Sequence, residues 1–150
     1  MNRFRFRLET VLKLRAARED EKNRELAAAL VQLNQEEQRY RKLVDSLNDL
    51  DRIRAERGNG RISARQLMQR LFFSRHLQKK CDEQKTNVCQ AEAVVQEKRR
   101  EVVEAMKKRK TLERLRERKR LQYEAEVLHQ EQNQLDEAGL QRFSAERHLV

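Results

Sequence analysis

Two cysteines are the residues whose type is best suited to metal or redox chemistry. Cys81 and Cys89 stand eight residues apart in a charged stretch, with no His at ligand spacing and no second Cys pair. On one helix their Cα atoms would lie roughly 12 Å apart, too far for a disulfide, and a structural zinc site needs four such ligands. We therefore interpret both as small packing residues of a protein in a reducing cytosol, and we expect no metal and no cofactor.

No motif of catalytic machinery stands in the sequence. The sequence has no Gly-x-x-x-x-Gly-Lys loop, the backbone cradle for the phosphates of ATP, so the chain is not expected to hydrolyse ATP. His76 is titratable, and we assign it no catalytic role. Two helices lying side by side bury only a seam, so a pocket for a small-molecule substrate would have to come from a partner. We predict that the protein is not an enzyme.

Composition favours helices as the elements that position these residues. The 150 residues are 40% charged and include no Pro, no Trp and only three Gly. A disordered chain can have a similar composition, but here the apolar residues recur at helical spacing. We predict an all-α fold, a long antiparallel two-helix coiled coil (α-hairpin) that forms a single domain over residues 1–150.

One cluster of turn residues divides the chain. Gly58, Asn59 and Gly60 can all adopt positive φ, which ends a helix at little cost. Ser63 and Gln66 follow with the spacing of a capping box, in which each side chain bonds the other residue's backbone N–H. We therefore expect a hairpin turn here and a second helix that begins at Ser63.

A later glycine, Gly139, suits the end of that second helix. The predicted segments are a helix over 2–57, a turn over 58–62, a helix over 63–138 and a frayed tail over 139–150. So short a turn requires antiparallel helices, with residue i facing roughly residue 120 minus i. The second helix is then the longer one and extends beyond the first.

Each predicted helix has a seam of apolar or small residues in steps of three and four. In the first helix the seam consists of Leu12, Ala16, Glu19, Asn23, Leu26, Leu30, Leu33, Glu37, Tyr40, Val44 and Leu47. In the second it consists of Leu67, Leu77, Cys81, Val88, Ala91, Val95, Val102, Ala105, Leu112 and Tyr123. The first seam becomes partly polar towards the amino terminus, so we expect looser packing there.

The net charge of +10 is unevenly distributed. Residues 98–120 carry +8, whereas residues 121–150 carry −4. Antiparallel pairing places the basic stretch beside the arginines near the amino terminus, a surface that would attract an acidic partner. Nucleic-acid binding is the less favoured interpretation, because the sequence has no basic region feeding a zipper, no zinc-finger spacing and no aromatics interleaved with Arg.

No segment approaches the run of about 18 apolar residues that spans a bilayer, and the amino terminus lacks the apolar core of a secretory signal. Residues 1–18 resemble an Arg-rich transit peptide, but the helical pattern continues past them without a cleavage-like break. We therefore predict a cytoplasmic protein.

Two motifs carry a resemblance to a known family. The opening Phe4-Arg-Phe-Arg-Leu-Glu-Thr-Val-Leu-Lys-Leu-Arg15 resembles the start of the bacterial flagellar protein FliJ. The segments Lys110-Thr-Leu-Glu-Arg-Leu115 through Tyr123, and Glu131-Gln-Asn-Gln-Leu-Asp-Glu137, resemble the family's ending. Chain length also agrees, so the resemblance covers essentially the whole sequence.

The resemblance implies a non-enzymatic component of the flagellar type III export apparatus, at the cytoplasmic face of the inner membrane. In that family the open end of the coiled coil enters the hexameric export ATPase and promotes its assembly. The protein also links the ATPase to the membrane export gate protein and escorts export chaperones. The alternatives are a generic cytoplasmic coiled-coil scaffold or chaperone and a basic helical nucleic-acid-binding protein.

The resemblance places two binding sites at opposite ends of the hairpin. The predicted ATPase-binding residues at the open end are Phe4, Phe6, Leu8, Val11, Arg114, Arg118 and Tyr123. The apolar ones could instead pack on the second helix. The predicted export-gate-binding residues are Phe72, Phe73, His76 and Leu77. Adjacent aromatics cannot both face one seam, so at least one should be exposed, unless the second helix bends and packs both on the first.

Overall fold

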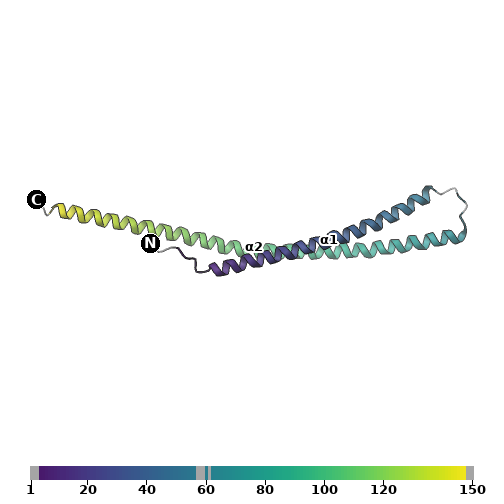
Figure 1. Ribbon diagram of the computed structural model, residues 1–150, viewed down its shortest axis with the longest axis horizontal. Helices are drawn as coiled ribbons and strands as arrows, with labels where there is room; N and C mark the ends of the chain where they lie inside the picture. Colours follow the sequence, from purple (N-terminus) through teal and green to yellow (C-terminus); the bar gives the residue numbers. More distant parts are fainter. Residues whose placement is uncertain (1–3, 57–59, 61, 148–150) are drawn as a thin grey trace. The chain divides into compact units, whose positions relative to one another are not determined.

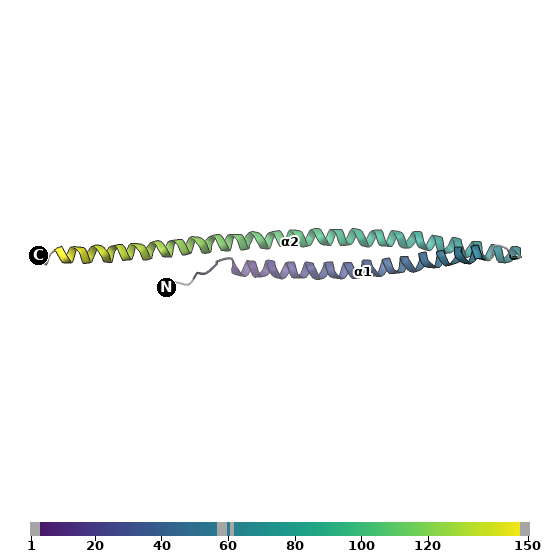
Figure 2. The same cartoon turned by 90° about the horizontal axis from the view of Figure 1, so that it is seen from above.

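The computed structural model describes residues 4–56, 60 and 62–147, with side chains described as far as residue 144. It contains two helices, α1 (Glu9–Glu56) and the longer α2 (Ala64–Arg147), and no strand among the described residues. The helices pack against each other in opposite directions (Figures 1 and 2). The predicted all-α antiparallel hairpin is therefore confirmed.

The hairpin groups into two compact parts. The turn part comprises Asp20–Glu104, and the terminal part comprises Met1–Glu19 with Ala105–Val150. Each part contains a stretch of both helices, so each has its own antiparallel helix pair and its own surface.

In the turn part, the core is a narrow seam between α1 and α2. Its buried side chains are Ala29, Leu77, Cys81 and Val95. On α2 the predicted seam residues from Leu77 to Val102 are all buried or half-buried. The side chains that pack the two helices are therefore few and mostly small.

Three predicted seam positions in this part are wrong. Leu30 is exposed while Ala29 is buried, and Asn23 is exposed while Lys22 is half-buried. The seam steps by three and then four residues, so a residue one position further along lies about 100° away and points to the flank. Leu67 is also exposed, since it lies close to the turn.

The start of α2 follows its predicted chemistry. The Ser63 N–H donates to Gln66 Oε1 over 3.4 Å, and the Gln66 N–H donates to Ser63 Oγ over 3.3 Å. These bonds form a capping box, and α2 continues without interruption from Ala64. Gly60 lies in a bend, whereas the predicted turn residues Gly58 and Asn59 lie outside the described residues.

Two predicted helix limits differ from the structure. Gly139 lies inside α2, which continues to Arg147, and its φ is not positive. It therefore does not adopt the left-handed conformation of a helix-terminating glycine. At the other end, α1 begins at Glu9 instead of residue 2, because residues 4–8 take a non-helical path on α2.

The pairing of the helices changes along the chain. In the turn part, Gln84 pairs with Glu36, whose numbers add to 120 as predicted. Lys98 pairs with Glu25, which raises that sum to 123. In the terminal part, the Phe4 ring lies against Tyr123, a sum of 127. The shift is already present within the helices of this part, where Arg109 pairs with Glu19, a sum of 128, and Arg116 lies near Glu9, a sum of 125.

Candidate functional site

The residues before α1 form an alternating segment in the terminal part. Phe4, Phe6 and Leu8 are half-buried, while Arg5 and Arg7 between them are exposed. A period of two fits an extended chain over residues 4–6, in which successive side chains point to opposite sides, and Arg7 and Leu8 form the turn that leads into α1. Apolar side chains therefore face α2 and arginines face outward, which holds the segment on α2 without a helix.

The first turn of α1 fixes the end of this segment. The Leu12 N–H donates to the Leu8 carbonyl over 2.9 Å, and the Glu9 N–H donates to the Phe6 carbonyl over 3.2 Å. Leu12 is buried in the seam immediately after this turn. The acidic Glu9 in the first turn also suits the partial positive charge at a helix amino terminus.

Together the segment and α2 enclose an apolar groove of about 740 Å³. The Phe4 and Tyr123 rings meet with centroids 5.7 Å apart and planes inclined by 44°. Basic side chains lie around the apolar ones, and the full lining is Phe4, Arg5, Phe6, Arg7, Leu8, Leu115, Lys119 and Tyr123. An apolar groove with a cationic rim suits a partner segment that carries apolar and acidic side chains.

The structure brings together four of the residues predicted at the open end, namely Phe4, Phe6, Leu8 and Tyr123. Arg114 and Arg118 are exposed and do not line the groove, and Val11 lies exposed on α1. Leu115 and Lys119 also line the groove, although they were not among the predicted residues. The alternation of Phe and Arg before Glu9 was the signal that could have found them, because it indicates an extended segment with a shifted pairing.

Charged pairs join the two helices beside the groove. Arg116 Nη1 lies 3.7 Å from Glu9 Oε1, and Arg109 on α2 pairs with Glu19 on α1. Hydrogen bonding to Glu19, and then to Glu113, raises the pKa of Arg109. Part of the basic stretch is thus neutralised internally, while Arg5, Arg7 and Lys119 stand at the rim of the groove.

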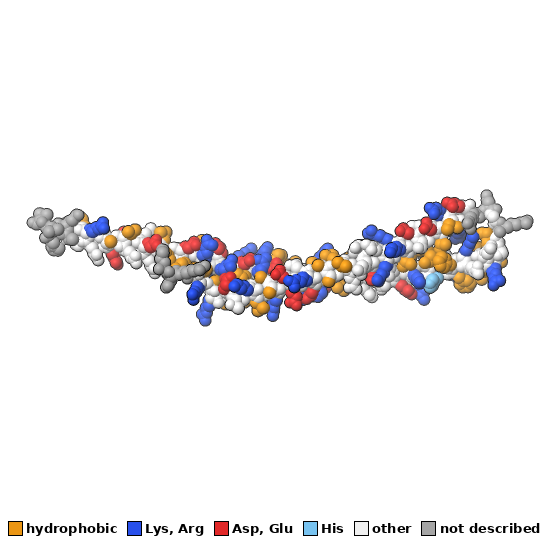
Figure 3. Space-filling view, viewed as in Figure 1, with side chains coloured by type: hydrophobic (Ala, Val, Ile, Leu, Met, Phe, Trp, Pro, Cys, Tyr) orange, Lys and Arg blue, Asp and Glu red, His pale blue; other side chains and the backbone are white. Residues whose placement is uncertain are grey.

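The turn part carries an apolar surface of its own. In Figure 1 the α1 and α2 ribbons separate towards the turn, and hydrophobic side chains gather over that end in Figure 3. The exposed large apolar residues are Ile53, Ile62, Leu67, Met68, Leu71, Phe72 and Phe73. We call this set the turn patch.

The predicted export-gate residues divide between this surface and the seam. Phe72 and Phe73 are both exposed, as is His76, whereas Leu77 is buried between the helices. The alternative in which both aromatics pack on the first helix is therefore wrong. Leu77 can support the patch from below but does not form part of its outer surface.

A ring of four charges crosses the seam further from the turn. Lys98 Nζ lies 2.7 Å from Glu25 Oε2, and Lys22 Nζ lies 2.8 Å from Glu101 Oε2. Lys22 also pairs with Glu25 and Lys98 with Glu101 along each helix. Hydrogen bonds from Lys98 and Lys22 lower the pKa of Glu25, and the same two lysines lower the pKa of Glu101. We call this set the Lys–Glu ring.

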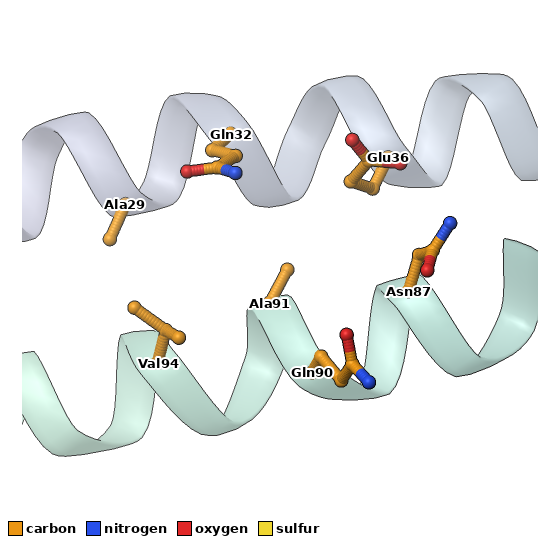
Figure 4. A pocket seen from close by; sticks show the side chains of 7 residues that line it. All are labelled: Ala29, Gln32, Glu36, Asn87, Gln90, Ala91 and Val94. Carbon is orange, nitrogen blue, oxygen red and sulfur yellow. The ribbon is translucent and has the colours of Figure 1, made fainter.

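A small hollow of about 300 Å³ lies between the ring and the turn patch. Figure 4 shows that Ala29, Gln32 and Glu36 from α1 face Asn87, Gln90, Ala91 and Val94 from α2. Alanines occupy the seam here, so short side chains leave space between the helices. The amides and the carboxylate line the edges of the hollow.

The family model described as "Flagellar FliJ protein" matches residues 4–148. The chain belongs to the FliJ family. The family resemblance in the opening and closing motifs is thereby confirmed. Searches of curated proteins and of solved structures gave no match.

Membership of the FliJ family supports a role related to flagellar export, in a family of non-catalytic proteins. Within the part of the chain that the structure describes, no helix is long and apolar enough to cross a bilayer. Nor do the described His, Cys, Asp and Glu side chains form a group of three or more that could hold a metal ion.

Proposed function

We propose that this FliJ-family chain is a non-enzymatic coiled-coil stalk of the flagellar type III export apparatus, which binds the hexameric export ATPase and promotes its assembly and activity. The observation that carries the proposal is the cationic-rimmed apolar groove formed by Phe4, Phe6, Leu8, Leu115 and Tyr123. It lies in the terminal part of the hairpin, where the segment before α1 lies against α2. In this proposal the protein acts as one coiled-coil domain in the cytoplasm, peripheral to the inner membrane.

Phe4 and Phe6 fix the shape of the groove and also form its apolar floor. Their half-burial leaves part of each ring available to a partner, while Arg5 and Arg7 attract acidic groups at the rim. The same residues thus combine the desolvated anchors and the polar rim that protein interfaces use. The exposed Arg114 and Arg118 extend the positive surface beyond the groove.

The test is to measure hexamer formation and turnover of the purified export ATPase with the full chain added. Wild-type protein should increase both, and Phe4→Ala with Phe6→Ala should lower the stimulation by about tenfold or more. Val31→Ala, which changes an exposed apolar residue of α1 in the turn part, is the matched control and should stimulate like wild type. Normal stimulation by the Phe variant would refute the groove as the contact.

We further propose that the turn patch contacts the membrane export gate protein and that the chain brings export chaperones to it. Exposed Phe72 and Phe73 beside Leu71 provide an apolar surface of the kind that marks interaction sites. Phe72→Ala with Phe73→Ala should weaken binding to the purified cytoplasmic domain of the gate protein and leave ATPase stimulation unchanged. Loss of ATPase stimulation in this variant, or undiminished gate binding, would contradict the assignment.

A further inference from the structure

The last described stretch of α2 carries an exposed apolar stripe that neither proposed contact uses. Leu121, Leu128 and Leu135 follow one another at seven-residue intervals, with exposed fractions of 57%, 58% and 72%. Seven residues make almost two turns of helix, so the three side chains lie along one side, as in a coiled-coil seam. We call these residues the tail stripe.

The surroundings of the tail stripe fit a second helix. With the leucines at one of the two core positions of the heptad, Ala125, Gln132 and Gly139 fall at the other. A Cβ added to Gly139 would meet nothing within 4 Å, so the surface beside it is open. Between residues 124 and 144 every side chain is exposed except that of Val127, which is half-buried. A partner helix can therefore approach the stripe closely.

Charge selects the kind of helix. In this heptad register Glu124, Glu131 and Asp136 occupy positions that flank the stripe, and Glu124 also pairs with Arg120 on the same helix at 2.9 Å. Residues 121–150 carry −4 in a chain of +10. Flanking acidic residues in a coiled coil favour Lys or Arg at the facing positions of the partner and disfavour acidic ones.

These charges argue against a second copy of the chain. Two tails paired together would bring acidic flanks against acidic flanks. The basic stretch of a second copy does not offer a free seam either, because Ala105 and Leu112 are half-buried in the packing of its own two helices. A different protein with an unoccupied basic seam satisfies both requirements.

We propose that the tail stripe is a docking surface for a basic amphipathic helix of another protein, which pairs with α2 as a coiled coil through Leu121, Leu128 and Leu135. The contact is separate from the groove at Phe4 and Phe6 and from the turn patch. It gives the family's coiled coil a third interaction surface, specific for a helix with apolar residues at heptad spacing and Lys or Arg beside them.

The probe is a synthetic peptide of about 28 residues, four heptads, with Leu at both core positions and Lys at the flanking ones. Its control has the same composition with the leucines scrambled. Fluorescence anisotropy of each labelled peptide with the full-length chain should show roughly tenfold or tighter binding of the heptad peptide. Both peptides meet the same net charge on the chain, so the difference isolates the stripe. Equal binding of the two peptides would overturn the proposal.

Matched variants locate the site. Leu128→Gln should weaken binding of the heptad peptide by about tenfold, whereas Leu14→Gln, on α1 with a similar exposed fraction of 54%, should change it by less than about twofold. Gln is a good helix former, and circular dichroism checks that helicity is retained. Glu131→Gln with Asp136→Gln should also weaken binding. Equal effects of Leu128→Gln and Leu14→Gln would contradict the assigned position.

Two further measurements separate this proposal from the others. Analytical ultracentrifugation should show that the tail stripe does not hold two copies of the chain together. A dimer that dissociates in Leu128→Gln would make the occupant a second copy and overturn the proposal. Leu128→Gln should also stimulate the export ATPase like wild type. Loss of that stimulation would assign the stripe to the ATPase contact and overturn the proposal of a separate partner, while leaving the test of Phe4 and Phe6 unaffected.

Discussion

Two neighbouring valines on α2 provide a sharp test of the seam. Val95 is 2% exposed and Val94 is 49% exposed, so replacing each by Ala removes the same atoms from different surroundings. At about 0.8 kcal/mol per buried CH₂, Val95→Ala loses about 1.6 kcal/mol of transfer free energy, and Val94→Ala loses about half of that. The better helix propensity of Ala returns up to about 0.6 kcal/mol in both variants and therefore cancels in the comparison.

Val95→Ala should accordingly lower the free energy of unfolding by about 1 kcal/mol more than Val94→Ala, and the cavity left between the helices increases the difference. Thermal unfolding followed by circular dichroism should show a midpoint roughly 2–4 °C lower for Val95→Ala than for Val94→Ala. Val94→Ala itself should stay within about 0.5 kcal/mol of wild type. Equal destabilisation by the two variants would refute the seam register.

Three further predictions concern the turn part. The pKa values of Glu25 and Glu101 are lowered in the fold, so the two ionised carboxylates stabilise the folded state at neutral pH, and this stabilisation is lost as the pH falls through the lowered values. The midpoint of thermal unfolding should therefore fall on acidification. It should fall less steeply in the double variant Glu25→Gln with Glu101→Gln. Ser63→Ala removes the capping hydroxyl and should destabilise the start of α2 by about 1 kcal/mol. Amide hydrogen exchange in the first turn of α2 should become faster, and unchanged exchange would refute the cap. Cys89 is exposed and Cys81 buried, so a thiol reagent should label Cys89 first, and rapid labelling of native Cys89→Ser would contradict that burial.

The parts of the fold that depend on local chemistry were predictable. Ser63 and Gln66 are close in sequence, and their reciprocal bonds form as expected. Heptad spacing also identified most of α2's seam, because a period of seven determines one side of a long helix. The prediction that Leu30 lies in the seam was wrong for a physical reason. Both Ala29 and Leu30 continue a three-four pattern, and only the facing helix decides which of them is buried.

The candidate site was harder to predict, since it depends on a non-helical segment. Phe4, Phe6 and Leu8 can be read as the first residues of an amphipathic helix, but their alternation with Arg5 and Arg7 fits an extended chain better. The non-helical segment places Phe4 against Tyr123 and lines the groove together with Leu115. The predicted helix end at Gly139 was also wrong. Glycine commonly ends a helix, but Gly139 lies within α2 on an exposed side, at a cost of about 1 kcal/mol relative to Ala.

Charges in the seam explain how so thin a core specifies its pairing. Lys22 and Lys98 occupy positions that apolar residues fill elsewhere, and each is matched by a carboxylate on the opposite helix. Sliding the helices by one heptad towards pairs that add to 116 would place Lys22 beside Val94 and Glu25 beside Ala91, and both charges would lose their partners on α2. Exposed ion pairs stabilise a fold only slightly, but polar core residues penalise incorrect registers strongly. The Lys–Glu ring therefore acts chiefly on register, which keeps small residues such as Ala29 and Val95 in the seam and sets which side chains remain on the surface for partners.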